Sequence, residues 1–312
     1  MIMDVFLLNA NGILLKFEAL NFKMKKFPTF FVVGAAKSGT SALWNYFQKH
    51  PDIFVTNDIS IKELGYFSNQ YGINDKNDYL NFFSNAKGNQ IIGEVCHAYL
   101  TSEESAAWIK KEIPHSKIII ILRNPIDRAF SLYNWMIMEG YENAINFRKA
   151  LQLEKSRKNI KLLHSFNQNY LYFESGMYYE QVKRYIDVFG KENVIVLPYE
   201  EFGRNELCYL NKIFNFLGVS KITSLTSESV NKSKAVRVVY FQYLMRKMLI
   251  IFKNRPRICR LILYIMKKNT TSNKPNQIAK ELKEELKEKY RKDIEMLSKL
   301  CDCNFNKLWL YD

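Results

Sequence analysis

A short stretch near the amino terminus constrains the fold of this chain more than any other. Residues 30–47 read FFVVGAAKSGTSALWNYF: an apolar run of strand type, a loop rich in glycine and hydroxyl side chains, and the start of a helical pattern. Gly34 and Gly39 let the loop turn so that consecutive backbone N–H groups face inward, and the helix adds the positive end of its dipole. The stretch therefore predicts a strand–loop–helix unit that binds an anion such as a phosphate.

The lysine of this loop stands in an unusual place. The nucleotide triphosphatase pattern G-x-x-x-x-G-K-[ST] matches at both glycines and at Ser41, but Thr40 occupies the lysine position and Lys37 lies inside the loop. A kinase would also need an acidic residue at the end of a neighbouring strand to bind magnesium. The best neighbouring strand, KIIIILRNP, ends in Arg123 instead. The loop therefore favours a phosphate ligand held without magnesium, and a P-loop kinase is the alternative.

A second phosphate-binding motif follows in RNPIDRAFSLYNW, residues 123–135. Arg123 leaves the strand end, and Ser131 falls nearly two turns along a helix that begins at about Pro125. A guanidinium with bidentate hydrogen bonds and a serine hydroxyl can share one phosphate. Together the two motifs predict two anion sites in one protein.

Strand and helix patterns alternate along the chain. Nearly all-apolar strands suit a parallel sheet that is buried on both faces. The expected fold is therefore α/β in three layers, with a central, mostly parallel sheet and helices on both faces. The clearest predicted strands are Phe30–Gly34, Ile91–Glu94, Lys117–Leu122 and Asn193–Pro198, and the clearest predicted helices are Ser41–His50, Ser102–Glu112, Pro125–Glu139 and Tyr178–Phe189.

The domain organisation expected is one domain over residues 24–312, with insertions near 141–175 and 240–275, and a dispensable extension over residues 1–23. No apolar run reaches the roughly 18 residues that span a bilayer. Residues 240–268 alternate apolar clusters with bases. They are consistent with an amphipathic helix pair lying on a membrane, or with a packing helix whose outer face is basic, and the second interpretation is favoured.

Composition indicates an anionic partner. The chain has 46 Lys and Arg against 31 Asp and Glu, a net charge of +15, which suits a nucleotide, nucleic acid, anionic glycan or membrane surface. Lysines that merely solvate the surface are an equal alternative, and no nucleic-acid motif is present. The five cysteines and four histidines match no metal spacing. We therefore expect no metal, reduced thiols and a cytoplasmic location.

Several segments, spread along the chain, resemble one family. AAKSGTSAL and ILRNPIDRAFSLYNW resemble the 5′- and 3′-phosphate elements of sulfotransferases that use 3′-phosphoadenosine 5′-phosphosulfate (PAPS), closest to heparan-sulfate-type and bacterial carbohydrate sulfotransferases. The further segments, in order, are IKELGYFS (61–68), GEVCHAYL (93–100), SGMYYEQVKRYIDVFGKENVIVLPYEEF (175–202), NKSKAVR (231–237) and the tail YRKDIEMLSKLCDCNFNKLW. The resemblance covers roughly residues 27–309 with gaps.

The resemblance implies PAPS as cofactor and 3′,5′-adenosine bisphosphate as product. It implies that the first loop holds the 5′ side of the nucleotide, that Arg123 and Ser131 hold the 3′-phosphate, and that a late loop completes the site. The cofactor-binding residues implied are Ala36, Lys37, Ser38, Gly39, Thr40, Ser41, Arg123, Ser131, Tyr178, Ser233, Lys234 and Ala235. Ala235 stands where the family usually has glycine.

The resemblance also implies catalytic roles. Lys37 would stabilise the charge that develops on the leaving oxygen, and Glu63 would remove the proton of the acceptor. His97 is the alternative base, since related cytosolic sulfotransferases use histidine. Lys62, Glu94 and Tyr99 are expected to bind substrate, although Val95, Cys96 and His97 depart from the Lys, Ser/Thr and Pro of glycan-acting relatives.

The function expected is therefore transfer of a sulfuryl group from PAPS to a hydroxyl or amine of a carbohydrate, polysaccharide or glycolipid. A P-loop nucleotide kinase and a non-catalytic basic module that binds anionic glycan or membrane remain alternatives. We expect no nucleic-acid partner. A peripheral contact with the inner face of the membrane would involve residues 240–268.

Overall fold

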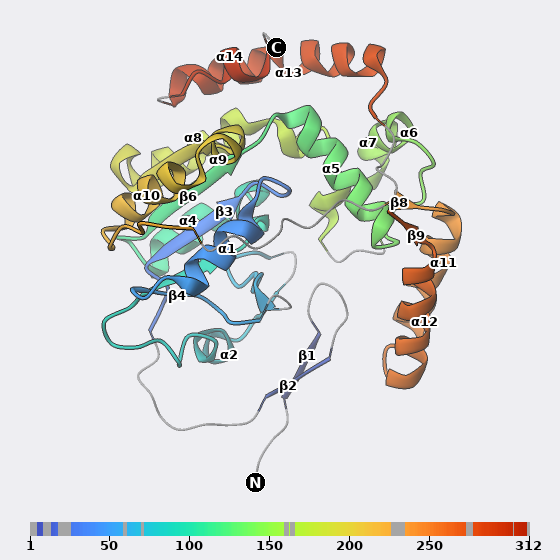
Figure 1. Ribbon diagram of the computed structural model, residues 1–312, viewed down its shortest axis with the longest axis horizontal. Helices are drawn as coiled ribbons and strands as arrows, with labels where there is room; N and C mark the ends of the chain where they lie inside the picture. Colours follow the sequence, from blue (N-terminus) through green and yellow to red (C-terminus); the bar gives the residue numbers. More distant parts are fainter. Residues whose placement is uncertain are drawn as a thin grey trace. The chain divides into compact units, whose positions relative to one another are not determined.

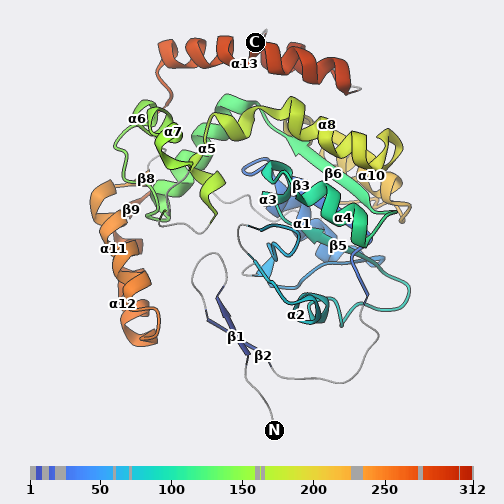
Figure 2. The same ribbon diagram turned by 180° about the vertical axis from the view of Figure 1, so that it is seen from behind.

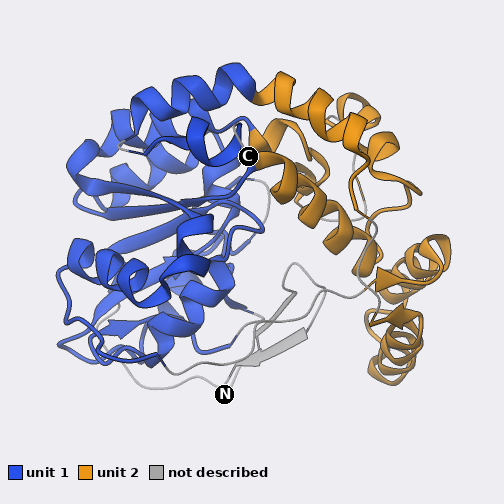
Figure 3. Ribbon diagram, turned by 45° about the horizontal axis from the view of Figure 1, so that its top comes forward, with its two compact units in different colours: residues 1–124, 177–228, 291–312 blue, residues 125–176, 229–290 orange. Residues whose placement is uncertain are grey.

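The computed structural model describes residues 5–8, 14–17, 26–58, 61–69, 72–158, 162, 166–225, 235–272, 277–301 and 303–310. The chain divides into two compact units, coloured separately in Figure 3. Unit 1 comprises residues 1–124, 177–228 and 291–312, and unit 2 comprises residues 125–176 and 229–290. Both segments predicted as insertions, near 141–175 and 240–275, belong to unit 2.

A five-stranded parallel sheet in the order β4-β5-β3-β6-β7 forms the centre of unit 1 (Figures 1 and 2). Every residue of β3 is buried, as expected for an apolar strand that is covered on both faces. The strands are β3 (Phe30–Gly34), β4 (Ile53–Phe54), β5 (Ile91–Val95), β6 (Lys117–Leu122) and β7 (Val194–Pro198). The predicted three-layer α/β fold is confirmed.

Alternate residues of β3 serve the two faces of this sheet. Phe30 and Val32 belong to a core cluster with the helices α1 (Thr40–Lys49) and α10 (Glu206–Leu217). Phe31 instead contacts the rings of Phe67 and Tyr99. The opposite face carries α3 (Ala98–Thr101), α4 (Ser105–Glu112) and α8 (Tyr178–Phe189). This alternation follows from the two-residue period of a strand.

The start of α8 is held by the carboxyl-terminal tail. Asp293, in α13 (Lys280–Leu300), accepts a hydrogen bond from the Tyr178 N–H at 2.7 Å. A carboxylate is favourable at a helix N-terminus, and burial raises the pKa of Asp293 to about 6. The other elements of unit 1 are β1 (Val5–Leu8), which pairs antiparallel with β2 (Leu14–Phe17), α2 (Lys76–Asn81), η4 (Lys191–Asn193), α9 (Tyr199–Arg204) and α14 (Phe305–Trp309).

Unit 2 is built around α5 (Pro125–Met138). Its interior holds a buried ion pair in which Arg157 donates to both oxygens of Glu142, at 2.7 and 2.8 Å. Its other elements are α6 (Phe147–Gln152), α7 (Glu154–Arg157), η2 (Asn167–Tyr170), η3 (Glu174–Gly176), β8 (Ala235–Val236), α11 (Val239–Ile251), α12 (Pro256–Lys268) and β9 (Thr270–Thr271). Among the described residues, no helix is long and apolar enough to cross a membrane.

Candidate active site

Three predicted site residues follow the carboxyl ends of neighbouring strands in unit 1. Strand β5 leads to His97, β3 leads to Lys37, and β6 leads directly to Arg123. Because parallel strands open onto the same edge of a sheet, residues after their carboxyl ends come together. Arg123 Nη1 donates to the Lys37 carbonyl oxygen at 3.3 Å, and its guanidinium lies 5.3 Å from the centre of the Tyr199 ring. The two anion-binding motifs therefore meet at Lys37 and Arg123.

The loop between β3 and α1 has the form of an anion cradle. Gly39 stands at the N-cap of α1 with φ 86°, no side chain caps the helix, and its first turn contains no acidic residue. The first N–H groups of the helix can therefore bind an anion. A Cβ atom at Gly39 would stand 2.8 Å from the Tyr199 ring. Lys37 adopts the left-handed conformation that few non-glycine residues adopt, with φ 65°.

Ser38 supplies an independent sign that this loop holds a ligand. Its side chain is fully buried, and its Oγ finds no hydrogen-bond partner among the described residues. A buried hydroxyl without a partner costs about 1–3 kcal/mol. A phosphate or sulfate oxygen in the loop would accept a hydrogen bond from this hydroxyl. The residues of the loop therefore fit the phosphosulfate end of PAPS.

Lys62, Glu63 and His97 form one charged group beside the loop. Lys62 Nζ donates to Glu63 Oε1 at 2.8 Å, to Ser41 Oγ at 3.3 Å and to Thr40 Oγ1 at 3.4 Å. The second carboxylate oxygen of Glu63 pairs with His97 Nδ1. Burial would raise the pKa of Glu63, but the charges of His97 and Lys62 outweigh it and hold that pKa well below its usual range. Glu63 is therefore ionised.

The chemistry open to this group follows from these contacts. The two oxygens of the Glu63 carboxylate are already engaged, one by Lys62 and the other by His97. His97 is bound to Glu63 through Nδ1, so a proton exchanged with a substrate would use Nε2. A carboxylate that orients an imidazole and stabilises its charged form is a recurring arrangement for acid–base catalysis. The geometry thus makes the two candidate bases, Glu63 and His97, a coupled pair.

Glu94 and Tyr99 hold the backbone that follows Glu63. The Glu94 carboxylate is buried and accepts hydrogen bonds from Tyr79 and Tyr99, each at 2.6 Å, and from the Gly65 backbone. The Tyr99 hydroxyl accepts from the Phe67 N–H at 3.2 Å. Burial raises the pKa of Glu94 to about 7. These contacts fix residues 65–67, and the predicted direct contact of Glu94 or Tyr99 with substrate stays a prediction.

Two contributing residues were missed by sequence reasoning. Tyr79 lies on α2, fifteen positions before Glu94, and no motif marks it. Tyr199 stands directly after β7, and an aromatic residue at the carboxyl end of a parallel strand is a signal that could have found it. It packs against Arg123 and limits the space at Gly39.

The remaining predicted cofactor residues lie in several places. Tyr178 is buried and its hydroxyl donates to the Arg123 carbonyl oxygen at 3.0 Å, so it supports Arg123, and a contact with phosphate stays a prediction. Ser131 lies on α5 in unit 2, whereas Arg123 belongs to unit 1. Their sharing of one phosphate also stays a prediction. Ser233 and Lys234 lie outside the described residues.

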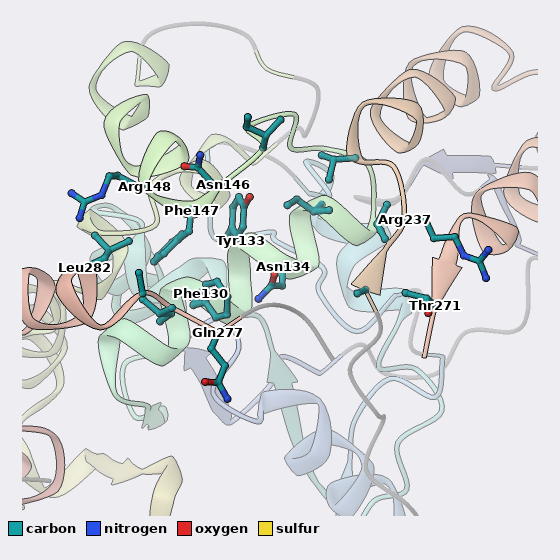
Figure 4. A pocket seen from close by; sticks show the side chains of 17 residues that line it. Phe130, Tyr133, Asn134, Asn146, Phe147, Arg148, Arg237, Thr271, Gln277 and Leu282 are labelled. Atoms are coloured by element: carbon teal, nitrogen blue, oxygen red, sulfur yellow. The ribbon is translucent and has the colours of Figure 1, made fainter. Parts of the chain in front are cut away.

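Unit 2 contains a cavity of about 1010 Å³ (Figure 4). Phe130, Tyr133 and Phe147 form an aromatic group in its wall, with ring centroids 5.3 to 6.2 Å apart. Asn134 and the predicted cofactor residue Ala235 also line it. Apolar and aromatic side chains with a few polar groups among them are usual in the wall of a ligand pocket.

The family model of the sulfotransferase domain matches residues 27–299. The chain belongs to this sulfotransferase family. The structure of a sulfotransferase from Alicyclobacillus acidocaldarius is similar to it, with a TM-score of 0.65 and 29% identity over 88% of this chain and 96% of that one. The resemblance predicted from these sequence segments is thereby confirmed.

Two curated relatives match shorter parts. The chain is 32% identical over 117 residues to the membrane-associated sulfotransferase kil1 of Dictyostelium discoideum, covering 37% of this chain and 24% of that protein. It is 25% identical over 206 residues to the human bifunctional heparan sulfate N-deacetylase/N-sulfotransferase 2, covering 64% and 23% respectively. The chain thus spans about a quarter of the length of these relatives.

Proposed function

We propose that this sulfotransferase moves a sulfuryl group from PAPS to a hydroxyl or amine of a carbohydrate acceptor. One observation carries the proposal: Lys62 joins the anion cradle to the proton-transfer pair. It contacts Thr40 and Ser41 at the start of α1 and Glu63, which binds His97. A phosphate-binding loop and an acid–base group in one site are what transfer from a nucleotide to an acceptor hydroxyl requires.

The nucleotide side of the site belongs to the loop. When bound, PAPS supplies the sulfuryl group on a phosphate that must accept negative charge as it leaves. The Lys37 ammonium and the N-terminus of α1 stabilise that charge. The Ser38 hydroxyl donates the hydrogen bond for which the described residues offer no acceptor. Arg123, held on the Lys37 carbonyl and on Tyr199, adds a second positive charge.

The acceptor side belongs to His97 and Glu63. As the acceptor oxygen becomes the nucleophile, its O–H bond breaks and the proton passes to His97 Nε2. Glu63 stays ionised, holds Nδ1 and stabilises the imidazolium that forms. This assignment differs from the expectation that Glu63 itself is the base. It follows from the contacts of Glu63, whose two carboxylate oxygens are already engaged by Lys62 Nζ and His97 Nδ1.

The acceptor class rests on the relatives and on the fold. The human relative is named for N-sulfation of heparan sulfate, and the sulfotransferase fold is shared over most of the chain. A carbohydrate, polysaccharide or glycolipid acceptor is therefore proposed. The cytoplasmic location predicted from the cysteine pattern is part of the same proposal.

Transfer of labelled sulfate from PAPS to a panel of glycans tests the function, with calorimetric binding of 3′,5′-adenosine bisphosphate in EDTA alongside. Lys37→Ala should lower kcat by about 10²–10³, the usual cost of losing one charge-stabilising group, while binding of the bisphosphate changes much less. Lys111→Ala, an exposed lysine on α4, is the matched control and should leave kcat unchanged. A magnesium-dependent preference for ATP, or full activity of Lys37→Ala, would contradict the proposal.

A further inference from the structure

The exposed apolar surface of this protein is concentrated in one place. Of the twelve large hydrophobic side chains exposed in the described part of the chain, eleven lie between Val238 and Tyr264. All of these except Val238 belong to α11 and α12, which pack against each other and are here called the α11–α12 hairpin, residues 239–268 (Figure 1). A contiguous apolar surface of this kind marks an interaction site.

The outer face of α11 is apolar rather than polar. Tyr240, Phe241, Leu244, Met248 and Ile251 recur at spacings of one, three and four residues, so they share one face of the helix. All five are exposed, with Tyr240 at 61% and Ile251 at 73%. A helix that packs only against its own protein buries its apolar face and exposes its polar one. The outer face of α11 is therefore apolar and not basic, unlike in the interpretation favoured from the sequence, although the helix does pack on α5 and α12.

Polar contacts fix this orientation within unit 2. Gln242 and Arg246, on the opposite face of α11, are buried. Gln242 donates to the Met138 carbonyl oxygen at 2.8 Å, and Arg246 pairs with the Glu139 carboxylate at 2.8 Å. Between the two helices only a small core of Leu249, Ile262 and Met266 is buried, together with partly buried neighbours. The inner face of α11 thus makes its own buried contacts, and the apolar outer face is not part of the core of unit 2.

Positive charge is concentrated in the same segment. Residues 229–280 contain thirteen of the 46 Lys and Arg and none of the 31 Asp and Glu. The rest of the chain holds 33 bases against 31 acids and is nearly neutral. Lys253, Arg255, Arg257 and Arg260, at the turn of the hairpin and the start of α12, are exposed. None of these four forms an ion pair within the residues that the structure describes.

From this arrangement we propose that the α11–α12 hairpin docks on the surface of an anionic lipid bilayer. Apolar side chains enter the boundary of the acyl chains, and the flanking bases bind the headgroups. A second copy of the chain is disfavoured because it would bring two strongly positive hairpins together. Nucleic acid would be bound through its phosphates and would leave Leu244, Ile251 and Leu261 exposed. The inference does not depend on the proposed enzymatic activity.

Sedimentation of the full chain with vesicles tests the proposal. The vesicles are pure phosphatidylcholine, or phosphatidylcholine with one quarter phosphatidylglycerol, at low and high salt. Wild type should bind the anionic vesicles and bind neutral ones far more weakly. Arg255→Gln/Arg257→Gln/Arg260→Gln should lower the partition coefficient about a hundredfold, a roughly fivefold loss for each base.

The matched control removes the same charge elsewhere. Lys111→Gln/Lys283→Gln/Lys299→Gln changes three exposed lysines outside the hairpin and should bind within about threefold of wild type. Equal losses in the two triple variants would mean that net charge alone attracts the protein, and would overturn the proposal.

The apolar face is tested separately by Leu244→Ser/Ile251→Ser/Leu261→Ser. These side chains are exposed, so thermal unfolding should be unchanged, whereas binding to anionic vesicles should fall at least tenfold. Retention of binding would overturn the role of this face. The proposal would also be overturned if wild type bound neither kind of vesicle, or if it self-associated and this variant did not. The hairpin would then bind a partner other than a lipid bilayer.

Discussion

The buried carboxylate of Glu94 predicts a pH-dependent stability that can be measured directly. Its side chain is 2% exposed and its pKa is raised from 4.5 to about 7, chiefly by burial. Between these pH values the folded protein keeps the Glu94 proton, whereas the unfolded chain has lost it. The folded state binds more protons there, so its stability must fall as the pH rises.

The magnitude follows from the same pKa. For each pH unit over which only the folded state holds the proton, the free energy of unfolding falls by about 1.4 kcal/mol. The loss due to Glu94 is therefore about 3 kcal/mol between pH 4.5 and 7. Below this window both states are protonated and the contribution is fully present. Above it both are ionised and the contribution has been lost.

Comparison with Glu94→Gln isolates this contribution, since glutamine does not titrate. Denaturant-dependent hydrogen exchange at the amides of β5 reports the opening of unit 1. The free energy of unfolding of wild type minus that of Glu94→Gln should fall by about 3 kcal/mol across the window, whatever offset the amide introduces. Glu192→Gln, at an exposed glutamate, should give a curve parallel to wild type. A parallel curve for Glu94→Gln would refute the reasoning.

Two further predictions concern catalysis and the loop. His97→Asn should lower kcat by about 10²–10⁴. A pH profile of wild-type kcat that stays flat to below pH 4 would instead favour Glu63 as the base, because the pKa of Glu63 is held below its usual range. Gly39→Ala should weaken binding of adenosine bisphosphate at least tenfold, because its Cβ atom would stand 2.8 Å from the Tyr199 ring, and Tyr199→Ala in the same chain should restore part of the affinity. If Gly39→Ala bound adenosine bisphosphate as tightly as wild type in calorimetry, the loop would accommodate the added Cβ atom and the prediction would be wrong.

Sequence reasoning was most accurate for elements with a strong local pattern. The bounds of β3, β6 and α8 match the predicted ones, because apolar runs and helical periodicity identify such elements without tertiary contacts. The helix predicted from Ser102 begins at Ser105 instead. There the Ser105 hydroxyl donates to the Phe67 carbonyl oxygen, a contact with a segment more than thirty residues away, and lies 2.7 Å from the Ser102 hydroxyl.

The residues of the candidate site likewise divide into those that a local motif marks and those that only the fold brings together. Lys37 and Arg123 could be proposed from motifs, because a strand that runs into a glycine loop or an arginine leaves a local signature. The coupling of Glu63 to His97 could not, since these residues are 34 positions apart and meet only through the order of the strands. The engagement of both Glu63 oxygens, which changes the proposed base, is a product of that meeting.

The sequence by itself determined the α/β class, the anion-binding loop with its displaced lysine, and the basic segment around residues 240–268, because backbone conformation and charge are encoded locally. Only the tertiary structure decided which side chains face one another. It joined Lys62 to the cradle and to Glu63, buried Glu94 among tyrosines and turned the apolar face of α11 outward. The physical reason is that burial and ion pairing depend on contacts between distant segments, which no local pattern specifies.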